Sequence, residues 1–198
     1  MEIQKTRSNS KKQIITAAFE NFVVHGYEGA SLSLIADMVG IRKASIYTHF
    51  SSKEALFLEL LQQAIIIECD YIRTCFAEAG DEKLPGEAYC YALKKQYSHS
   101  VSLRFLIRMA YAPPADLIVA ITDGYFRYIQ VLLQQIQSAL RLIDLNEDEV
   151  TLYSDAYLGI IDSLTVELLY DQSFYERRLK ALLFLYQNTL QQSLLKQN

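Results

Sequence analysis

Apolar residues recur every three to four positions along most of the chain, and this spacing predicts amphipathic helices rather than strands. The first helix is expected over residues 11–25, and Gly26 is the residue that should end it. Its predicted buried face carries Ile15, Ala18, Phe19, Phe22 and Val23.

Two short helices follow, and the residues between them favour a tight turn. Ser31 is suited to cap the second helix, and Gly40 stands where a positive φ is needed. The third helix is expected from Lys43 to His49. Four residues should face inward between the two helices: Ile35, Ala36, Ile41 and Ile46. Two short helices joined in this way predict a helix-turn-helix.

The remaining chain reads as six longer helices separated by breaks rich in polar residues, Gly or Pro. Ser51 or Ser52 can cap the first of these helices. The clearest loop is predicted at residues 80–86, directly after that helix. The six helices are expected at about 52–79, 87–99, 103–111, 114–142, 149–170 and 173–195. Nine helices without a strand predict an all-α protein.

Composition supports a well-packed protein in two parts. Hydrophobic residues make up 51% of the 198 residues, with only seven Gly and three Pro. We expect a head at residues 1–51 and a body at residues 52–198. No apolar run is long enough to span a bilayer, and residues 1–12 lack the apolar core of a signal peptide. Cys69, Cys75 and Cys90 lack the spacing of a zinc site, so a cytoplasmic protein without a metal is expected.

The distribution of charge separates the two parts. The formal net charge is -4, but residues 1–53 hold seven Lys and Arg against four Asp and Glu. Residues 54–198 hold twelve against nineteen. A basic head on an acidic body predicts that the head meets nucleic-acid phosphates.

The predicted third helix leaves a mixed polar and aromatic face outward. That face carries Lys43, Ala44, Tyr47, Thr48 and His49. A short helix fits a major groove about 12 Å wide, where such side chains reach phosphates and base edges. Tyr47 could instead pack on the first helix and His49 could be an ordinary surface histidine, but the spacing of the whole set favours DNA contact.

The basic residues at the start of the chain leave two interpretations open. Lys5, Arg7, Lys11 and Lys12 either form a solvated tail or an arm that touches the minor groove or the backbone.

Residues 41–56, IRKASIYTHFSSKEAL, resemble the signature of TetR-family regulators, and the resemblance extends over about residues 11–60. It implies a nine-helix TetR-like architecture, with a three-helix DNA-binding head and a helical-bundle regulatory body. By position it implies groove contacts from Lys43, Ala44 and Tyr47, and a DNA contact from Ser45. It implies phosphate contacts from Ser31, Tyr47, His49 and Lys53.

Arg42 departs from the family pattern, which has Ser or Thr at this position to cap the recognition helix. An arginine side chain cannot cap a helix N-terminus, and its charge opposes the helix dipole there, at a cost of about 1 kcal/mol. We interpret Arg42 as a clamp for phosphate or guanine.

The body is rich in tyrosine, which lines ligand cavities well because it joins an apolar ring to a polar tip. We expect a pocket for a lipophilic or aromatic effector, although an aromatic core is the alternative for each single tyrosine. The predicted lining is Tyr71, Tyr89, Phe105, Arg108, Met109, Tyr125, Tyr128 and Asp162.

The acidic residues within apolar helical faces include Asp162, and each needs a partner once it is buried. Ion pairs with Arg104, Arg108 or Arg127 are favoured over a cationic effector as that partner. Residues 102–114 also resemble a segment of TetR-type regulators of multidrug efflux.

The last two helices are apolar over more than one face, which predicts a partner chain. Two copies would form a two-fold four-helix bundle, and the resemblance implies the same arrangement. The predicted homodimer interface is Leu158, Ile161, Thr165, Leu168, Leu179, Leu183, Tyr186 and Leu190.

These observations predict a DNA-binding transcriptional regulator, a repressor that a small-molecule effector releases from double-stranded operator DNA. The chain offers no nucleophile–base pairing, phosphate-binding loop or metal-ligand spacing, so neither catalysis nor a cofactor is expected. Two alternatives stay open: a helical ligand-binding or protein-interaction module without specific DNA binding, and an enzyme activity in the tyrosine-lined cavity.

Overall fold

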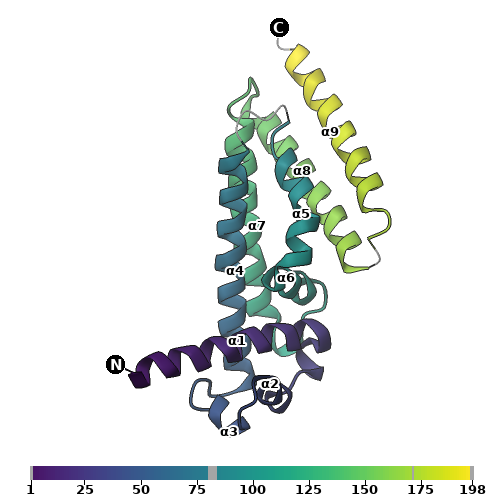
Figure 1. The fold of residues 1–198 in the computed structure, drawn as a ribbon. Helices are drawn as coiled ribbons and strands as arrows, with labels where there is room; N and C mark the ends of the chain where they lie inside the picture. Colours follow the sequence, from purple (N-terminus) through teal and green to yellow (C-terminus); the bar gives the residue numbers. More distant parts are fainter. Residues whose placement is uncertain (1, 80–83, 171, 197–198) are drawn as a thin grey trace. The chain divides into compact units, whose positions relative to one another are not determined.

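The computed structural model describes residues 2–79, 84–170 and 172–196, and it describes side chains only for residues 10–79, 84–170 and 172–195. Every regular element within these ranges is a helix, and the predicted all-α, nine-helix fold is confirmed (Figure 1). The α-helices are α1 (Glu2–Gly29), α2 (Leu32–Val39), α3 (Lys43–Ile46), α4 (Lys53–Glu78), α5 (Glu87–His99), α6 (Val101–Tyr111), α7 (Ile118–Leu140), α8 (Glu147–Leu169) and α9 (Tyr175–Lys196), and a 3-10 turn, η1 (Ala115–Leu117), precedes α7.

Short polar side chains set the helix starts. The Ser31 hydroxyl accepts a hydrogen bond from the Leu34 amide, as expected for the cap of α2, and Gly40 ends α2 in the left-handed conformation. Asn146 and Glu149 form a reciprocal capping box that starts α8 earlier than predicted. The third helix was predicted too long, since regular α-helix ends at Ile46.

The buried face of α1 includes the predicted Ala18, Phe19 and Phe22 but differs at the ends of the predicted stripe. Ile14 is fully buried, whereas Ile15 is half-buried. Asn21 shares this face, and its amide nitrogen lies 3.7 Å from the Met38 sulfur. The Asn21 carbonyl oxygen is buried without a hydrogen-bond partner among the described residues. The helical period identified this side of α1 but could not fix which of two adjacent isoleucines is innermost.

The described chain forms two compact units, and neither is continuous in sequence. Unit 1 comprises residues 1–67 and 100–126, and unit 2 comprises residues 68–99 and 127–198. Both α4 and α7 therefore contribute to each unit. The predicted functional division between residues 51 and 52 is a different kind of boundary and stays a prediction.

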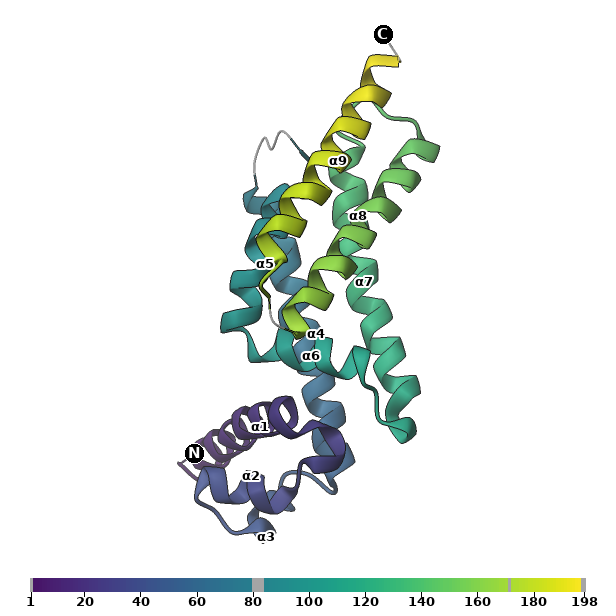
Figure 2. The ribbon, with the colours of Figure 1, turned by 90° about the vertical axis from the view of Figure 1, so that its right-hand side faces the viewer.

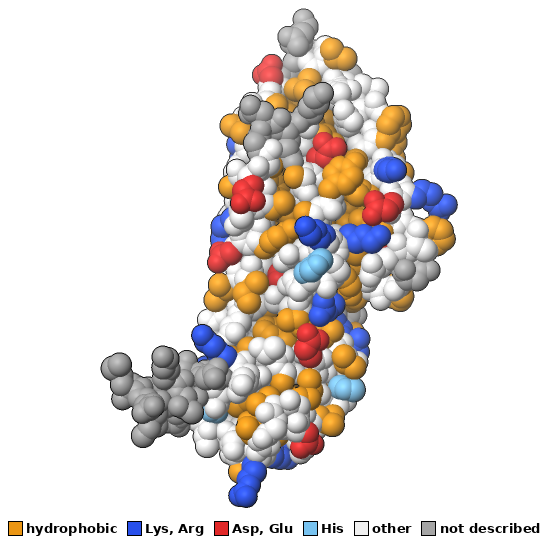
Figure 3. Space-filling model, in the orientation of Figure 1, with side chains coloured by type: hydrophobic (Ala, Val, Ile, Leu, Met, Phe, Trp, Pro, Cys, Tyr) orange, Lys and Arg blue, Asp and Glu red, His pale blue; other side chains and the backbone are white. Residues whose placement is uncertain are grey.

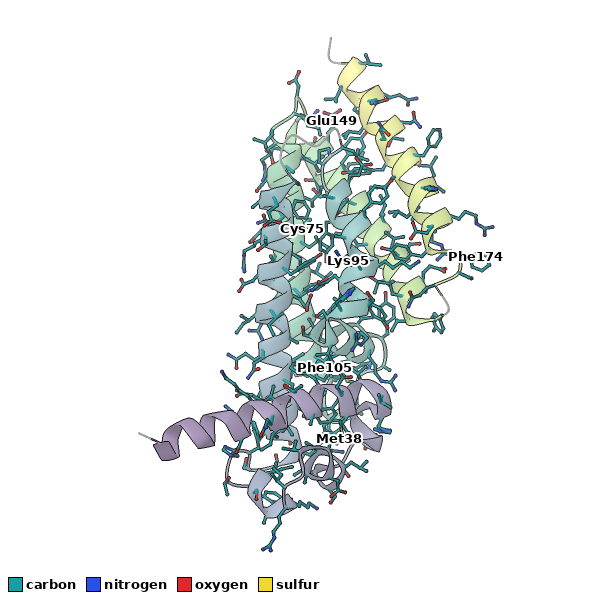
Figure 4. The ribbon with its side chains drawn as sticks, viewed as in Figure 1. Met38, Cys75, Lys95, Phe105, Glu149 and Phe174 are labelled. Atoms are coloured by element: carbon teal, nitrogen blue, oxygen red, sulfur yellow. The ribbon has the colours of Figure 1, made fainter. Side chains whose placement is uncertain are left out.

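Unit 1 is held by aromatic side chains from α1, α4 and α6. The Phe105 ring lies 5.4 Å from Phe19, 6.2 Å from Phe22 and 5.2 Å from Phe57, measured between ring centroids. Phe105 is fully buried, and Figure 4 labels it beside the α1 ribbon. Helix α6 thus packs against α1 and the first turns of α4, although it is distant from both in sequence.

Unit 2 contains α5, α8, α9 and the C-terminal parts of α4 and α7. Helices α8 and α9 lie side by side (Figure 2), and the Tyr153 hydroxyl donates to the Thr189 carbonyl at 2.7 Å. Gly86, at φ 79°, lies against Tyr157: a β-carbon there would stand 2.5 Å from the tyrosine ring. The Tyr157 hydroxyl donates to the Gly86 carbonyl at 2.8 Å. Glycine is needed here for both its backbone conformation and the close approach.

Among the described residues, no single helix has the length and apolarity to cross a membrane, and only α6 together with the η1–α7 segment passes that test, as a bent pair. The predicted loop at residues 80–86 lies in part outside the described residues, which resume at Leu84.

Candidate DNA-binding surface

Helix α3 presents its predicted DNA-contacting face to solvent. Arg42, Lys43, Ala44 and Thr48 are exposed, and Tyr47 keeps 51% of its surface accessible. Ile46, on the opposite side, is fully buried and fixes α3 to the unit. The Tyr47 ring therefore lies at the surface of the unit and not in its interior. Figure 3 shows Lys and Arg side chains projecting where α3 lies.

The chain after α3 continues as hydrogen-bonded turns. The His49 amide donates to the Ile46 carbonyl at 2.9 Å, and the Thr48 hydroxyl donates to the Ser45 carbonyl at 2.7 Å. His49 is half-buried, with its ring 6.4 Å from that of Phe50. These hydrogen bonds fix the backbone conformation of Tyr47, Thr48 and His49, although the regular α-helix ends at Ile46.

Arg42 occupies the N-cap position of α3 in an extended backbone conformation and makes no capping hydrogen bond through its side chain. The exposed guanidinium is available to an anion, and the N-terminus of α3 lacks the cap that Ser or Thr would supply.

Lys53 has a structural role that the sequence did not reveal. Its ammonium group donates to the Tyr27 carbonyl at 2.8 Å and to the Ala30 carbonyl at 3.3 Å, and it lies 4.2 Å from the centre of the Tyr27 ring. The lysine therefore holds the C-terminal end of α1 onto the start of α4. The predicted phosphate contact of Lys53 competes with this arrangement.

The basic N-terminal segment is partly tied down. Lys11 forms a 2.9 Å ion pair with Glu59, and its ammonium lies 5.4 Å from the Phe50 ring centre. Lys12 is exposed. The side chains of Lys5 and Arg7 lie outside the described residues, so the choice between tail and arm stays open for them.

The predicted effector pocket is divided between the two units. Phe105, Arg108, Met109 and Tyr125 belong to unit 1, where Phe105 is part of the aromatic core. Within unit 2, Tyr71, Tyr89 and Tyr128 do come together: the hydroxyls of Tyr89 and Tyr128 are 2.9 Å apart, and the rings of Tyr71 and Tyr89 are 6.4 Å apart. Burial raises the pKa of Tyr89 well above its usual value.

Asp162 was wrongly placed in the interior. It lies on the exposed side of α8, and Arg104, one of its three proposed partners, instead pairs with Glu20 at 3.6 Å. The buried carboxylates among the described residues of unit 2 are Glu68, which is 1% exposed, and Glu167, which pairs with Arg178 at 2.8 Å. Glu68 lies one helical turn before the buried Ile72 on α4, so the apolar period of that helix could have identified it.

Most of the residues predicted for the homodimer interface point into the chain's own core and not toward a partner. Helix α8 packs on α9 within the single chain, and Leu158 is half-buried there. The other seven predicted residues are buried: Ile161, Thr165, Leu168, Leu179, Leu183, Tyr186 and Leu190. The exposed large apolar residues of α8 and α9 are different ones, among them Leu152, Phe184 and Leu185. Both sets lie on apolar helices, and periodicity cannot say which face meets the chain's own core.

A groove of about 480 Å³ lies in unit 1 between α1 and α2. Thr16 and Glu20 line it on α1, and Met38 and Val39 line it on α2.

The arrangement of α1, α2 and α3 defines a helix-turn-helix protein with an outward recognition helix. Residues 14–60 match the family model "Bacterial regulatory proteins, tetR family". Over 59 residues the chain is 42% identical to the transcriptional activator FasR of Mycolicibacterium smegmatis, and over 60 residues it is 38% identical to the regulator RutR of Escherichia coli K12. Each match covers 30% of this chain and 27% or 28% of the relative, so the chain matches less than a third of the length of these relatives.

Solved structures extend the likeness to the fold of the whole chain. A TetR-family transcriptional regulator from Mesorhizobium loti superposes with a TM-score of 0.67 at 19% identity, covering 92% of this chain and 97% of that one. FadR from Bacillus subtilis, in complex with stearoyl-CoA, gives a TM-score of 0.61 at 21% identity, covering 91% and 97%. Residues 14–60 are therefore similar to TetR-family proteins in sequence, and the chain as a whole is similar in fold to solved TetR-family structures.

Replacing Arg42 with serine separates capping from anion binding. We expect Arg42→Ser to stabilise the protein by about 1 kcal/mol, because serine caps α3. We also expect the slope of log binding constant against log salt concentration to become shallower by about one per subunit, because one phosphate contact is lost. Urea unfolding followed by circular dichroism, and titration of a labelled DNA duplex at several KCl concentrations, measure the two effects. An unchanged slope would contradict the clamp.

Replacing Lys53 tests its structural role. We expect Lys53→Met to lower the free energy of unfolding by about 1–3 kcal/mol, because the carbonyls of Tyr27 and Ala30 lose a charged donor. The salt slope of DNA binding should stay unchanged. Lys12→Met, at an exposed lysine of the same unit, is the matched control for stability. A stable Lys53→Met protein with a slope shallower by one would show that Lys53 binds phosphate instead.

Proposed function

We propose that this protein is a transcriptional regulator that binds operator DNA as a homodimer and leaves it when a small molecule binds the body. The exposed face of α3, within a segment that matches the TetR-family DNA-binding region, carries this proposal. Lys43 and Arg42 supply positive charge there, and Tyr47 supplies a ring and a hydroxyl for the major groove.

The second subunit is proposed to dock on the outward faces of α8 and α9. Phe184 is 65% exposed, and Leu185 and Leu152 are also exposed. Gly159 is exposed on α8, and a β-carbon built there would have no atom within 4 Å. Another helix can therefore approach the α8 backbone closely at this point. Burying these residues against a second copy removes apolar surface from water and gives the two-fold symmetry that a pair of recognition helices needs.

The effector is proposed to act by selecting a dimer geometry. A ligand that prefers a geometry in which the two recognition helices are wrongly spaced weakens operator binding by its differential affinity, typically about 1–3 kcal/mol. The relatives do not share one sign of regulation, since FasR is named an activator and AcnR of Corynebacterium glutamicum a repressor. We propose repression, with the protein acting in the cytoplasm where the DNA lies.

The class of regulated genes is a finer proposal. The segment at residues 102–114 resembles one in regulators of multidrug efflux, so genes for the export of lipophilic compounds are the proposed targets. The tyrosines gathered in unit 2 support a lipophilic or aromatic effector.

DNA recognition can be tested by selecting bound sequences from a random duplex library. We expect an inverted repeat whose half-sites are separated by about one helical turn, roughly 34 Å, or a multiple of it. Tyr47→Ala should then weaken binding to the selected operator about 10- to 100-fold, because a base or groove contact contributes about 1–3 kcal/mol. Tyr91→Ala, at an exposed tyrosine of unit 2, is the matched control. If no sequence is enriched, or if Tyr47→Ala binds as the wild type does, specific recognition by α3 is wrong.

The dimer can be tested by placing a charge on its proposed face. We expect Phe184→Glu to give a monomer in sedimentation velocity and to lose operator binding, because a carboxylate would be buried without a partner. Leu142→Glu changes a residue that is 87% exposed at the end of α7, and this control should remain dimeric. A Phe184→Glu protein that stays dimeric would place the interface elsewhere.

A further inference from the structure

The groove between α1 and α2 has the size of a site for a small molecule. Its volume of about 480 Å³ lies within the range of ligand pockets, about 300–1,000 Å³. Figure 4 labels Met38 at this place, where α2 lies against α1. Residues of α1 form one side, and Met38 and Val39 of α2 form the other: the α1 residues are Lys12, Gln13, Thr16, Ala17 and Glu20.

Asn21 is a buried polar residue next to this groove. It is 3% exposed, and its carbonyl oxygen has no hydrogen-bond partner among the described residues. Its amide nitrogen lies 3.7 Å from the Met38 sulfur, and a thioether is only a weak acceptor. Buried polar groups are nearly always hydrogen-bonded, because a bond left unmade is unfavourable. Both ends of the Asn21 amide are therefore poorly satisfied by the chain itself.

The Asn21 amide lies behind the side chain of Met38. On α1, Asn21 follows Glu20 directly and stands one helical turn after Ala17, so it continues the α1 side of the groove. Its amide points toward α2, because it contacts Met38 there. Met38 is 54% exposed, and its unbranched side chain rotates readily. A rotation of this side chain opens the groove to the amide.

The rest of the lining favours an uncharged ligand. Lys12 and Glu20 bring opposite charges to the groove, and Glu20 pairs with Arg104 at 3.6 Å. The two charges balance, so the groove attracts neither anions nor cations strongly. Met38 and Val39 supply apolar surface on which a flat ring can pack.

We propose that this groove binds a small, uncharged, planar molecule with a lactam edge, in which an N–H donor and a carbonyl acceptor are adjacent. The ligand N–H donates to the Asn21 Oδ1 atom, and the ligand carbonyl accepts from Nδ2 in place of the Met38 sulfur. Asparagine makes the same pair of hydrogen bonds with the donor and acceptor of an adenine edge. The site uses α1 and α2 alone, so it goes beyond the proposed function and does not depend on an effector in unit 2.

Two bicyclic molecules that differ at one atom test the lactam edge on the full chain. 2-Quinolone has adjacent N–H and C=O groups, whereas N-methyl-2-quinolone has the same ring and carbonyl without the donor, and both are uncharged at neutral pH. We expect the wild type to bind 2-quinolone about tenfold more tightly in equilibrium dialysis, because the methyl group removes the hydrogen bond to Asn21 and blocks its place. Equal affinities would overturn the proposal.

Replacing Asn21 with leucine locates the preference. Asn21→Leu should fold with at least the stability of the wild type, because it removes a buried polar group without good partners. It should lose the preference for 2-quinolone over N-methyl-2-quinolone. Asn188→Leu, at a half-buried asparagine of α9, is the matched control and should keep it. A preserved preference in Asn21→Leu, or a clear loss of stability in urea unfolding, would refute the role of Asn21.

Filling the groove gives a test that leaves Asn21 in place. Ala17→Leu adds a larger side chain to the α1 side and should weaken 2-quinolone binding about tenfold, because the ring loses its space. Val24→Leu enlarges an exposed residue of α1 outside the groove and should bind as the wild type does. If Ala17→Leu binds 2-quinolone with wild-type affinity, the ligand does not occupy this groove.

Discussion

The contact of four phenylalanine rings is the interaction on which unit 1 depends. Phe19 and Phe22 from α1, Phe57 from α4 and Phe105 from α6 meet with centroid distances between 5.2 and 6.2 Å. Each buried ring contributes about 1.5–3 kcal/mol, and edge-to-face geometry adds to this. The helix-turn-helix has little core of its own, because α2 and α3 are only eight and four residues long. The orientation of its outward face therefore depends on the aromatic contacts between α1, α4 and α6.

Helix periodicity and capping residues were sufficient to predict nine helices and the outward face of α3. They succeeded because Ser31 and Gly40 act locally, within one or two turns of the backbone they control. They failed where two faces of a helix are both apolar. The stripe with Leu183 and Leu190 was assigned to a partner subunit, yet it is buried in the chain's own core. Only the three-dimensional packing of α8 on α9 decides which stripe is internal.

Polar side chains inside the protein were the second limit of sequence reasoning. Lys53 was interpreted through its likeness to a family position, whereas its bonds to the Tyr27 and Ala30 carbonyls depend on a contact 23 to 26 residues away. Asp162 and Glu68 are both carboxylates within apolar stretches, but only Glu68 is buried. Sequence pattern finds such residues, and the tertiary packing then determines whether they meet solvent, a backbone group or an aromatic ring.

The membership of α6 in the same unit as the helix-turn-helix bears on how such proteins can be recombined. A hybrid regulator made by exchanging residues 1–51 alone would leave Phe57 and Phe105 against foreign α1 side chains. The matching cut takes residues 1–67 together with 100–126, so that both sides of the aromatic contact come from one parent. Such an exchange requires three junctions in the gene instead of one, because unit 1 is discontinuous in sequence.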